Sequence, residues 1–340
     1  MAPPFRPLVR NPHILTIAGN FWRRAIDPQF PATRRHYRID SSTTIVALEH
    51  QPHSGARAQL VLLHGLEGSA DSGYMNSLSQ AALLRGFGVH RVNSRTCGGT
   101  EDLCETMYHS GLTSDTRAIL EDIRERHFGP AFVMGFSLGG NVALKLAGEL
   151  GETDLVAGFC AVSTPIDLAT CVRSLEKRSN ILYSKRFLRA LCNRIRRKRR
   201  SAPHLYPTSG LGNVKTVWEF DDLVTAPLFG FGTAANYYAT QSSMHYLDGI
   251  RVPTLVLCSK DDPLVPFSVY SHPAFDTNPA LTLIATEHGG HLGFLARGPS
   301  RFWLDQVALD WMESCLGSEI SGKGKQKIPF ERKEFAIRER

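Results

Sequence analysis

One stretch, residues 132–147, constrains the fold of this chain more than any other. A short apolar run ends in Gly-Phe-Ser-Leu-Gly at positions 135–139, and an Ala- and Leu-rich pattern of helical spacing follows at once. The order strand, sharp turn, helix is the setting in which a serine is held on a strained turn above a sheet. Gly135 and Gly139 supply the small neighbours that such a turn needs. The stretch therefore predicts a nucleophilic serine, Ser137.

The rest of the chain alternates predicted strands with predicted helices. Helical spacing predicts helices over 74–85, 113–126 and, with an amphipathic pattern, 301–312. Apolar runs bounded by turn residues predict strands at 34–40, 43–49, 59–63, 89–93, from 132, 155–163, 253–258 and 281–285. Such alternation calls for the α/β class, with a mainly parallel central sheet and helices on both faces.

The predicted elements divide the chain into five segments. Residues 1–31 are rich in Pro, Arg and aromatics and are expected to form a strap over the core, with Phe21 and Trp22 packing on it. Residues 32–163 and 248–315 are expected to form the first and second parts of the core. The alternation breaks at 164–247, which we expect to be a helical lid above the Ser137 turn. Residues 316–340 are polar and charge-rich and are expected to form a flexible tail.

Composition limits the class of protein. Hydrophobic content of 42% and charged content of 21% are ordinary for a soluble globular protein. The seven cysteines have no CxxC spacing, which favours thiols in a reducing compartment. The N-terminus lacks the apolar segment of a secretory signal, and no stretch approaches about 18 consecutive apolar residues. These features predict a cytoplasmic protein, and nothing in the sequence specifies an oligomeric state.

A serine hydroxyl needs a base that takes its proton and an acid that orients the base. With the serine on such a turn, the acid and then the histidine should follow it in the chain. Asp262 is the preferred acid, because the Asp-Pro-x-x-Pro turn after the 253–258 strand would aim it across the top of the sheet; its neighbour Asp261 is the alternative. His291 is the preferred base, because two glycines let its loop approach the serine, and His288 is its rival.

Acyl transfer also needs N–H donors for the oxyanion. One should be the N–H of Leu138, the residue after the nucleophile. The other should come from the His64-Gly65 loop after the 59–63 strand, where the N–H of Leu66 is the natural candidate. A zinc site at His288 and His291 is not expected, because they stand three apart in a Gly-Gly loop without a third ligand nearby. The expected reaction uses no metal or organic cofactor.

The ordered set of motifs resembles the YheT-like branch of the α/β-hydrolases, which also includes mammalian abhydrolase-domain lipid esterases. The resemblance covers roughly residues 5–315 and is carried by residues 11–17, 64–69, Tyr74, 93–99, 108–115, 135–141, 261–263 and 289–293. It implies the α/β-hydrolase fold, the triad of Ser137, Asp262 and His291, and hydrolysis of carboxylic esters, with acyl lipids among the substrates. One departure is Thr96, where the family usually has glycine, and it concerns the shape of that loop.

A strongly basic run lies inside the predicted lid. Its cations are Lys185, Arg186, Arg189, Arg194, Arg196, Arg197, Lys198, Arg199 and Arg200, and no acidic residue occurs between Glu176 and Glu219. Apolar residues recur at helical spacing within it, which predicts a basic amphipathic helix. The leading interpretation is a solvated helix face; contact with an anionic membrane surface comes next, then an acidic substrate or nucleic acid. Nucleic acid is not an expected partner.

We therefore expect a serine hydrolase that cleaves carboxylic esters of short to medium acyl chains, with a small-molecule ester as its partner. A thioesterase or amidase with the same triad is the alternative enzyme. The alternative of another kind is a non-catalytic interaction protein that binds anionic surfaces through the basic run. Asp115, His109 and Arg95 are expected to be buried polar residues that brace the site rather than take part in the chemistry.

Overall fold

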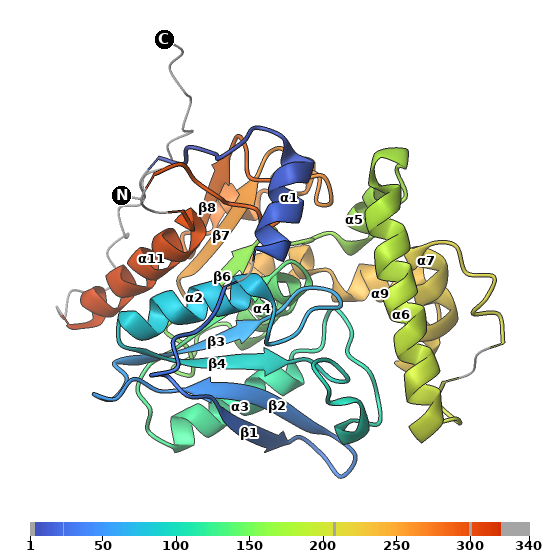
Figure 1. The fold of residues 1–340 in the computed structure, drawn as a ribbon, viewed down its shortest axis with the longest axis horizontal. Helices are drawn as coiled ribbons and strands as arrows, with labels where there is room; N and C mark the ends of the chain where they lie inside the picture. The colour runs from blue at the N-terminus through green and yellow to red at the C-terminus, as the bar shows by residue number, and fades with distance from the viewer. Residues whose placement is uncertain (1–3, 23, 207–208, 299–300, 321–340) are drawn as a thin grey trace.

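The computed structural model describes residues 4–22, 24–206, 209–298 and 301–320. Its centre is an eight-stranded sheet in the order β1-β2-β4-β3-β5-β6-β7-β8 (Figure 1). The strands are β1 Thr33–Arg38, β2 Thr44–His50, β3 Ala58–Leu63, β4 Phe87–Asn93, β5 Ala131–Phe136, β6 Gly158–Val162, β7 Thr254–Ser259 and β8 Leu281–Thr286. Only β2 pairs antiparallel with its neighbours β1 and β4, and all other pairs are parallel. The predicted α/β class with a mainly parallel sheet is confirmed.

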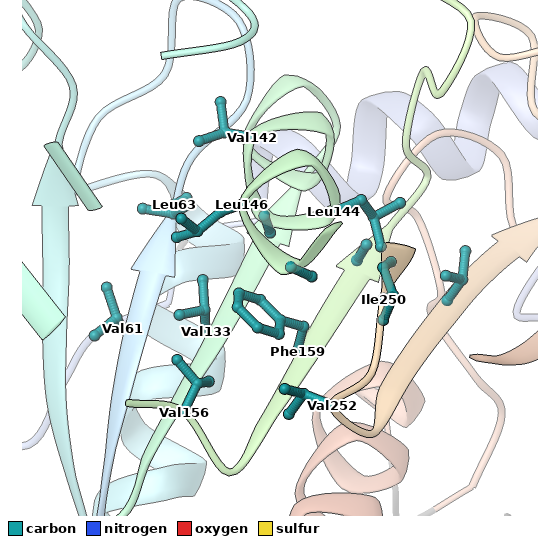
Figure 2. Packing of buried hydrophobic residues seen from close by; sticks show 14 of the residues in the cluster. Val61, Leu63, Val133, Val142, Leu144, Leu146, Val156, Phe159, Ile250 and Val252 are labelled. Atoms are coloured by element: carbon teal, nitrogen blue, oxygen red, sulfur yellow. The ribbon is translucent and has the colours of Figure 1, made fainter. Parts of the chain in front are cut away.

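Helices cover both faces of the sheet, and strand β3 shows how the sequence produces this. Its side chains alternate, so Leu60 and Leu62 face α2 (Gly73–Leu84) and α11 (Trp303–Ile320), while Val61 and Leu63 face α3 (Ser114–Glu125) and α4 (Leu138–Leu150). Figure 2 shows the second layer, with Val133 and Phe159 packed beneath α4. A strand buried on both faces reads as a continuous apolar run, which is why these strands were visible in the sequence.

The region 164–247 folds into helices beside the main sheet (Figure 1). They are α5 Leu168–Leu175, η2 Arg178–Asn180, α6 Ile181–Ser201, α7 Val217–Phe220, the π-helical turn η3 Asp221–Thr225, α8 Ala226–Leu228, α9 Ala234–Gln241 and η4 Ser243–Gly249. Their buried side chains, among them Ile195, Tyr206 and Phe220, form a small core of their own. We refer to this region as the helical insertion.

The N-terminal segment contains a helix that the sequence did not reveal, α1 Pro12–Phe21. Asn11 begins it, accepting the Ile14 N–H, and Pro12 occupies its first turn, where a missing N–H costs nothing. The prediction that Phe21 and Trp22 pack on the core is wrong for Phe21, which is 63% exposed. Trp22 is 41% exposed, although its ring meets that of Phe302 edge-on. The buried side of α1 is instead taken by the residues at 15, 16 and 19.

The C-terminal helix also differs from expectation. α11 continues to Ile320, so residues 316–320 are helical rather than part of a flexible tail. The remainder of the predicted tail, residues 321–340, lies outside the described residues. All seven cysteines are buried.

Candidate active site

Ser137 lies on the turn between β5 and α4, as the sequence predicted. Its φ of 53° and ψ of −118° place it in the left-handed half of backbone space, which a non-glycine residue rarely adopts. A Cβ on Gly139 would lie 2.4 Å from the Leu63 carbonyl oxygen, and one on Gly135 would lie 2.1 Å from that of Gly139. No side chain fits at either position, so the two glycines let the strand, the turn and the helix meet. Strained residues of this kind cluster at functional sites.

The structure brings Ser137 together with His291 and Asp262. The Ser137 Oγ lies 2.9 Å from His291 Nε2, and His291 Nδ1 lies 2.8 Å from Asp262 Oδ2. The other carboxylate oxygen of Asp262 accepts the N–H groups of Leu264 and Val265, at 2.8 and 3.1 Å, which holds the carboxylate in one orientation. The acid comes from the loop after β7 and the histidine from the loop after β8, so both reach the same edge of the sheet as Ser137.

The rival residues form a second acid–histidine pair. Asp261 Oδ2 lies 3.1 Å from His288 Nδ1, and Asp261 Oδ1 accepts the Gly290 N–H at 2.9 Å. Neither residue is among those around Ser137 that line the pocket described below. Asp261 therefore ties down the loop that carries His291, from the side away from the serine.

The loop after β3 approaches Ser137 closely. A Cβ on Gly65 would stand 3.1 Å from Ser137 Cβ, and the Gly65 N–H donates to the Tyr74 hydroxyl at 3.0 Å. His64 is fully used within the loop, with Nδ1 2.8 Å from the Gly65 carbonyl and Nε2 accepting the Ser94 N–H at 3.1 Å. Burial lowers the pKa of His64 to about 4, so the ring stays neutral and structural. Leu66 and Leu138 both lie at the pocket beside Ser137.

The pocket at Ser137 encloses about 810 Å³ of empty space, part of it open to solvent. Apolar side chains of the helical insertion form much of its wall, with Leu168, Val172, Leu175, Phe187, Leu191 and Val217 among them. Polar groups are few, and those of Tyr237 and Asp221 are occupied: Tyr237 Oη lies 2.6 Å from Ser110 Oγ, and Asp221 accepts from Thr225 and Tyr238, each at 2.5 Å. A largely apolar pocket with few polar groups suits an acyl chain.

A residue of the helical insertion also binds the loop after β3. Arg194 of α6 is 3% exposed, and its Nε donates to Glu67 Oε1 at 2.9 Å. Its Nη1 donates to the Thr96 hydroxyl at 2.8 Å and to the Thr96 carbonyl. Tyr108 Oη contacts the same Glu67, accepting its N–H at 2.9 Å. One buried guanidinium thus joins the insertion to the residue that follows Leu66.

The structure shows how Thr96 occupies a position where the family usually has glycine. It has a φ of 63°, the left-handed conformation that glycine adopts most easily, and it is fully buried. The threonine keeps the loop shape of a glycine and adds a hydroxyl that accepts from Arg194.

The basic run proves to be mixed rather than uniformly solvated. Arg194 and Lys198 are buried, and Lys198 Nζ donates to the carbonyls of Glu101 and Cys104 at 2.9 and 2.8 Å. A solvated-face interpretation is therefore wrong for these two residues, which pin α6 to the core. The other seven cations are exposed.

The expected bracing residues are buried and partnered. Arg95 donates to both carboxylate oxygens of Asp115, at 2.8 and 2.6 Å. His109 accepts the Gly111 N–H at 3.2 Å, and burial lowers its pKa to about 3.

Among the described residues, no group of three or more His, Cys, Asp or Glu is arranged to hold a metal ion. Within the same residues, no helix has the length and apolar character needed to cross a membrane.

Two functional contacts escaped sequence reasoning. The Thr16 hydroxyl accepts the main-chain N–H of His291, and Arg194 holds the loop of Leu66. Thr16 lies in the 11–17 motif, to which sequence analysis assigned no role at the site, and Arg194 lies within a run of like charges. For Arg194 the one available indication was the absence of acidic residues around the basic run. A buried cation in such a run must pair with a residue from another part of the fold.

The fold and the arrangement around Ser137 agree with the family comparison. Residues 59–297 match the α/β hydrolase fold family, so the chain belongs to that family. It is 33% identical over 313 residues to the Escherichia coli (strain K12) protein named "Putative esterase YheT", covering 90% of this chain and 91% of that one. The resemblance to the YheT-like branch is thereby confirmed.

Other relatives agree with this class. The chain is 29% identical to the Saccharomyces cerevisiae (strain ATCC 204508 / S288c) "Monoacylglycerol lipase", over 79% of this chain and 62% of that one. Among solved structures, 2,6-dihydroxy-pseudo-oxynicotine hydrolase superposes with a TM-score of 0.59 at 18% identity, covering 87% of this chain and 70% of that one, which bears on the fold alone. The chain is thus an esterase- and lipase-like α/β-hydrolase.

Proposed function

We propose that this protein is a serine hydrolase that cleaves carboxylic esters of short to medium acyl chains, acyl lipids included. The observation that carries the proposal is the hydrogen-bonded line from Asp262 through His291 to Ser137, which ends at a largely apolar pocket. In this proposal Ser137 Oγ attacks the ester carbonyl carbon while His291 Nε2 takes its proton. Asp262 keeps the proton of the neutral ring on Nδ1 and stabilises the imidazolium.

In this proposal the main-chain N–H groups of Leu66 and Leu138 donate hydrogen bonds to the carbonyl oxygen and stabilise the negative charge that develops there. Helix α4 begins at Leu138, so its N-terminal dipole also favours negative charge there. Collapse of the tetrahedral intermediate releases the alcohol, which receives its proton from His291. Water then gives a proton to His291, attacks the acyl-serine carbonyl, and releases the carboxylic acid with Ser137 restored.

The helical insertion at 164–247 acts in this proposal as the lid that selects the acyl group. Its side chains supply apolar wall opposite Ser137, as Leu175, Phe187 and Leu191 do. The names of two relatives support an acyl substrate with a hydrophobic tail, since one is called a monoacylglycerol lipase and another a medium-chain fatty acid ethyl ester synthase/esterase.

Labelling with a fluorophosphonate probe and turnover of p-nitrophenyl esters of graded acyl length test this function. The wild-type chain should be labelled and should hydrolyse short and medium esters, and Ser137→Ala should lose both properties. Lack of labelling of the wild type, or equal labelling of the Ser137→Ala variant, would refute a serine hydrolase and would favour the interaction protein. If matched thioesters or amides are turned over faster than the esters, the protein would instead be a thioesterase or an amidase.

A further inference from the structure

Exposed large apolar side chains are concentrated on one part of the molecule. Seven large hydrophobic residues among those described are exposed, and six of them belong to two short segments. Four lie at the outer side and end of α1, and two begin α6: Ile14, Ile17, Phe21, Trp22, Ile181 and Leu182. Leu182 is 79% exposed and Phe21 63%. Scattered exposed apolar residues need no explanation, but a concentration of this kind marks an interaction site.

The two segments form one surface although about 160 residues separate them in the sequence. His13 Nδ1 lies 3.1 Å from Tyr183 Oη, and the two rings stack with centroids 5.8 Å apart. The Arg186 guanidinium lies 5.1 Å from the centre of the Phe21 ring. Figure 1 shows α1 opposite the upper part of α6. We call this face, with its six apolar residues and the neighbouring cations, the α1/α6 surface.

The two segments that build the α1/α6 surface carry charge of one sign. Neither segment that builds it, residues 6–26 and 177–218, contains an acidic residue. Its exposed cations are Arg10, Lys177, Arg178, Lys185, Arg186 and Arg189. In the described part of the chain, the ion pairs found do not involve Lys185, Arg186 or Arg189. The opposite end of α6 differs, because there Arg194 and Lys198 turn inward and Arg197 pairs with Glu101.

The α1/α6 surface adjoins the pocket from two sides. Phe187, next to Arg186 in α6, lines the pocket that contains Ser137. On the other side, α1 packs on the loop of His291 so closely that a Cβ on Gly290 would lie 2.4 Å from the Pro12 carbonyl oxygen. A hydrophobic substrate that leaves a lipid layer at this surface would reach the pocket over a short path.

We propose that the α1/α6 surface docks on the anionic face of a lipid bilayer as a peripheral contact. Aromatic and aliphatic side chains flanked by Lys and Arg are the combination that favours the boundary between headgroups and acyl chains. The cations attract anionic headgroups, and Trp22 suits the interfacial position that tryptophan prefers. The contact is located at the N-terminal half of α6, whereas the sequence directed attention to the denser cations at its C-terminal end. The docking does not depend on the proposed ester chemistry.

Vesicle sedimentation and tryptophan fluorescence test the docking. The full chain should bind vesicles that contain phosphatidylserine far better than vesicles of phosphatidylcholine alone, and emission should shift to the blue. Trp22→Phe should remove that shift, since Trp303 and Trp311 are buried and the half-buried Trp218 packs against Tyr238 and Arg173. The triple variant Lys185→Gln, Arg186→Gln, Arg189→Gln should bind about 100-fold more weakly, from three interfacial cations. Ile17→Ser with Leu182→Ser should weaken binding to both kinds of vesicle.

The matched control removes the same charge at the other end of the helix, with Arg196→Gln, Arg197→Gln and Arg200→Gln. It should weaken binding much less than the first triple variant. The proposal is overturned if the wild type does not bind phosphatidylserine vesicles, or if the two triple variants lose binding equally. It is also overturned if the only effect of the surface substitutions is the dissociation of a dimer, measured by light scattering. Ser137→Ala should bind vesicles as the wild type does, so the outcome is separate from that of the probe-labelling experiment.

Discussion

The hydroxyl of Thr16 accepts the main-chain N–H of His291 at 2.8 Å and donates its own proton to the Pro12 carbonyl at 2.7 Å. The first helix of the chain therefore sets the position of the histidine that contacts Ser137. On the other side of the same loop, Asp261 accepts the Gly290 N–H. The loop that carries His291 is held at both flanks before any substrate arrives.

Replacing Thr16 by valine tests this role as a positioning residue. Thr16→Val keeps the side-chain shape but leaves the buried N–H of His291 without an acceptor, which costs about 1–3 kcal/mol. We expect kcat for a p-nitrophenyl ester to fall about tenfold while KM changes little, because the base is misplaced but the pocket is intact. Thr16→Ser should restore kcat. A change confined to thermal stability, with kcat preserved, would assign Thr16 a purely structural part.

The two neighbouring aspartates should respond very differently to the same change. Asp262→Asn removes the charge that stabilises the imidazolium and favours the wrong ring tautomer, so kcat should fall about 10³- to 10⁴-fold. Asp261→Asn keeps an oxygen for the Gly290 N–H and should stay within about threefold of the wild type. Steady-state kinetics on one ester compares them, and the reverse pattern would exchange the proposed roles of the two residues.

Arg194 is expected to matter for stability more than any exposed cation of α6. Its partners keep it charged in spite of its burial, because the Glu67 carboxylate and the Thr96 carbonyl both accept from the guanidinium. Arg194→Met leaves the Glu67 carboxylate without its cation, with the Tyr108 hydroxyl still donating to it, and should lower the free energy of unfolding by about 3 kcal/mol. Arg196 is exposed and donates to Asn193 rather than to these partners, so Arg196→Met should change the free energy of unfolding by no more than about 0.5 kcal/mol. Urea denaturation gives both values, and equal effects would contradict the buried tether.

Asp221 should make stability depend on pH in the direction opposite to that of a paired surface carboxylate. Burial raises its pKa to about 6, although Thr225 and Tyr238 donate to it. Between about pH 4 and pH 6 the folded state then binds more protons than the unfolded state, so the contribution of Asp221 to stability rises as the pH falls.

Asp221→Asn provides the measurement. The variant should gain stability relative to the wild type at pH 8, where the wild type holds a buried charge, and should lose that advantage below about pH 4. The difference in unfolding free energy should change by about 3 kcal/mol between these limits, for a shift of about two pKa units. A difference that stays constant with pH would place the charge in a better-solvated environment.

The parts of the site that sequence analysis predicted are those determined by local chemistry or chain order. The turn at Ser137 requires glycines at 135 and 139, and this requirement is written in five consecutive residues. Chain order required an acid and then a histidine after the serine. The Asp-Pro-x-x-Pro turn favoured Asp262, and the two glycines favoured His291. The structure brings these residues together, and it also gives Asp261 and His288 a pairing that sequence alone left open.

What sequence analysis missed depends on contacts between distant segments. Whether a cation such as Lys198 is solvated or buried depends on the carbonyls opposite it, which belong to residues 101 and 104. The packing predicted for Phe21 and Trp22 came from their apolar character. The helix α1 turns Phe21 outward and leaves Trp22 partly exposed, because residues 15, 16 and 19 take its buried side. Hydrophobicity sets the preference for burial, and only the fold decides which side of a helix satisfies it.

The contact between Thr16 and His291 spans 275 residues and has a consequence for how the protein forms. A nearby main-chain hydrogen bond, from the Leu8 N–H to the Leu295 carbonyl at 2.8 Å, also joins the two ends of the chain. Closing so long a loop is entropically slow, and during synthesis α1 has no partner for Thr16 until the segment around His291 has been made. Hydrolytic activity should therefore appear late in refolding, after the sheet has gained its circular-dichroism signal.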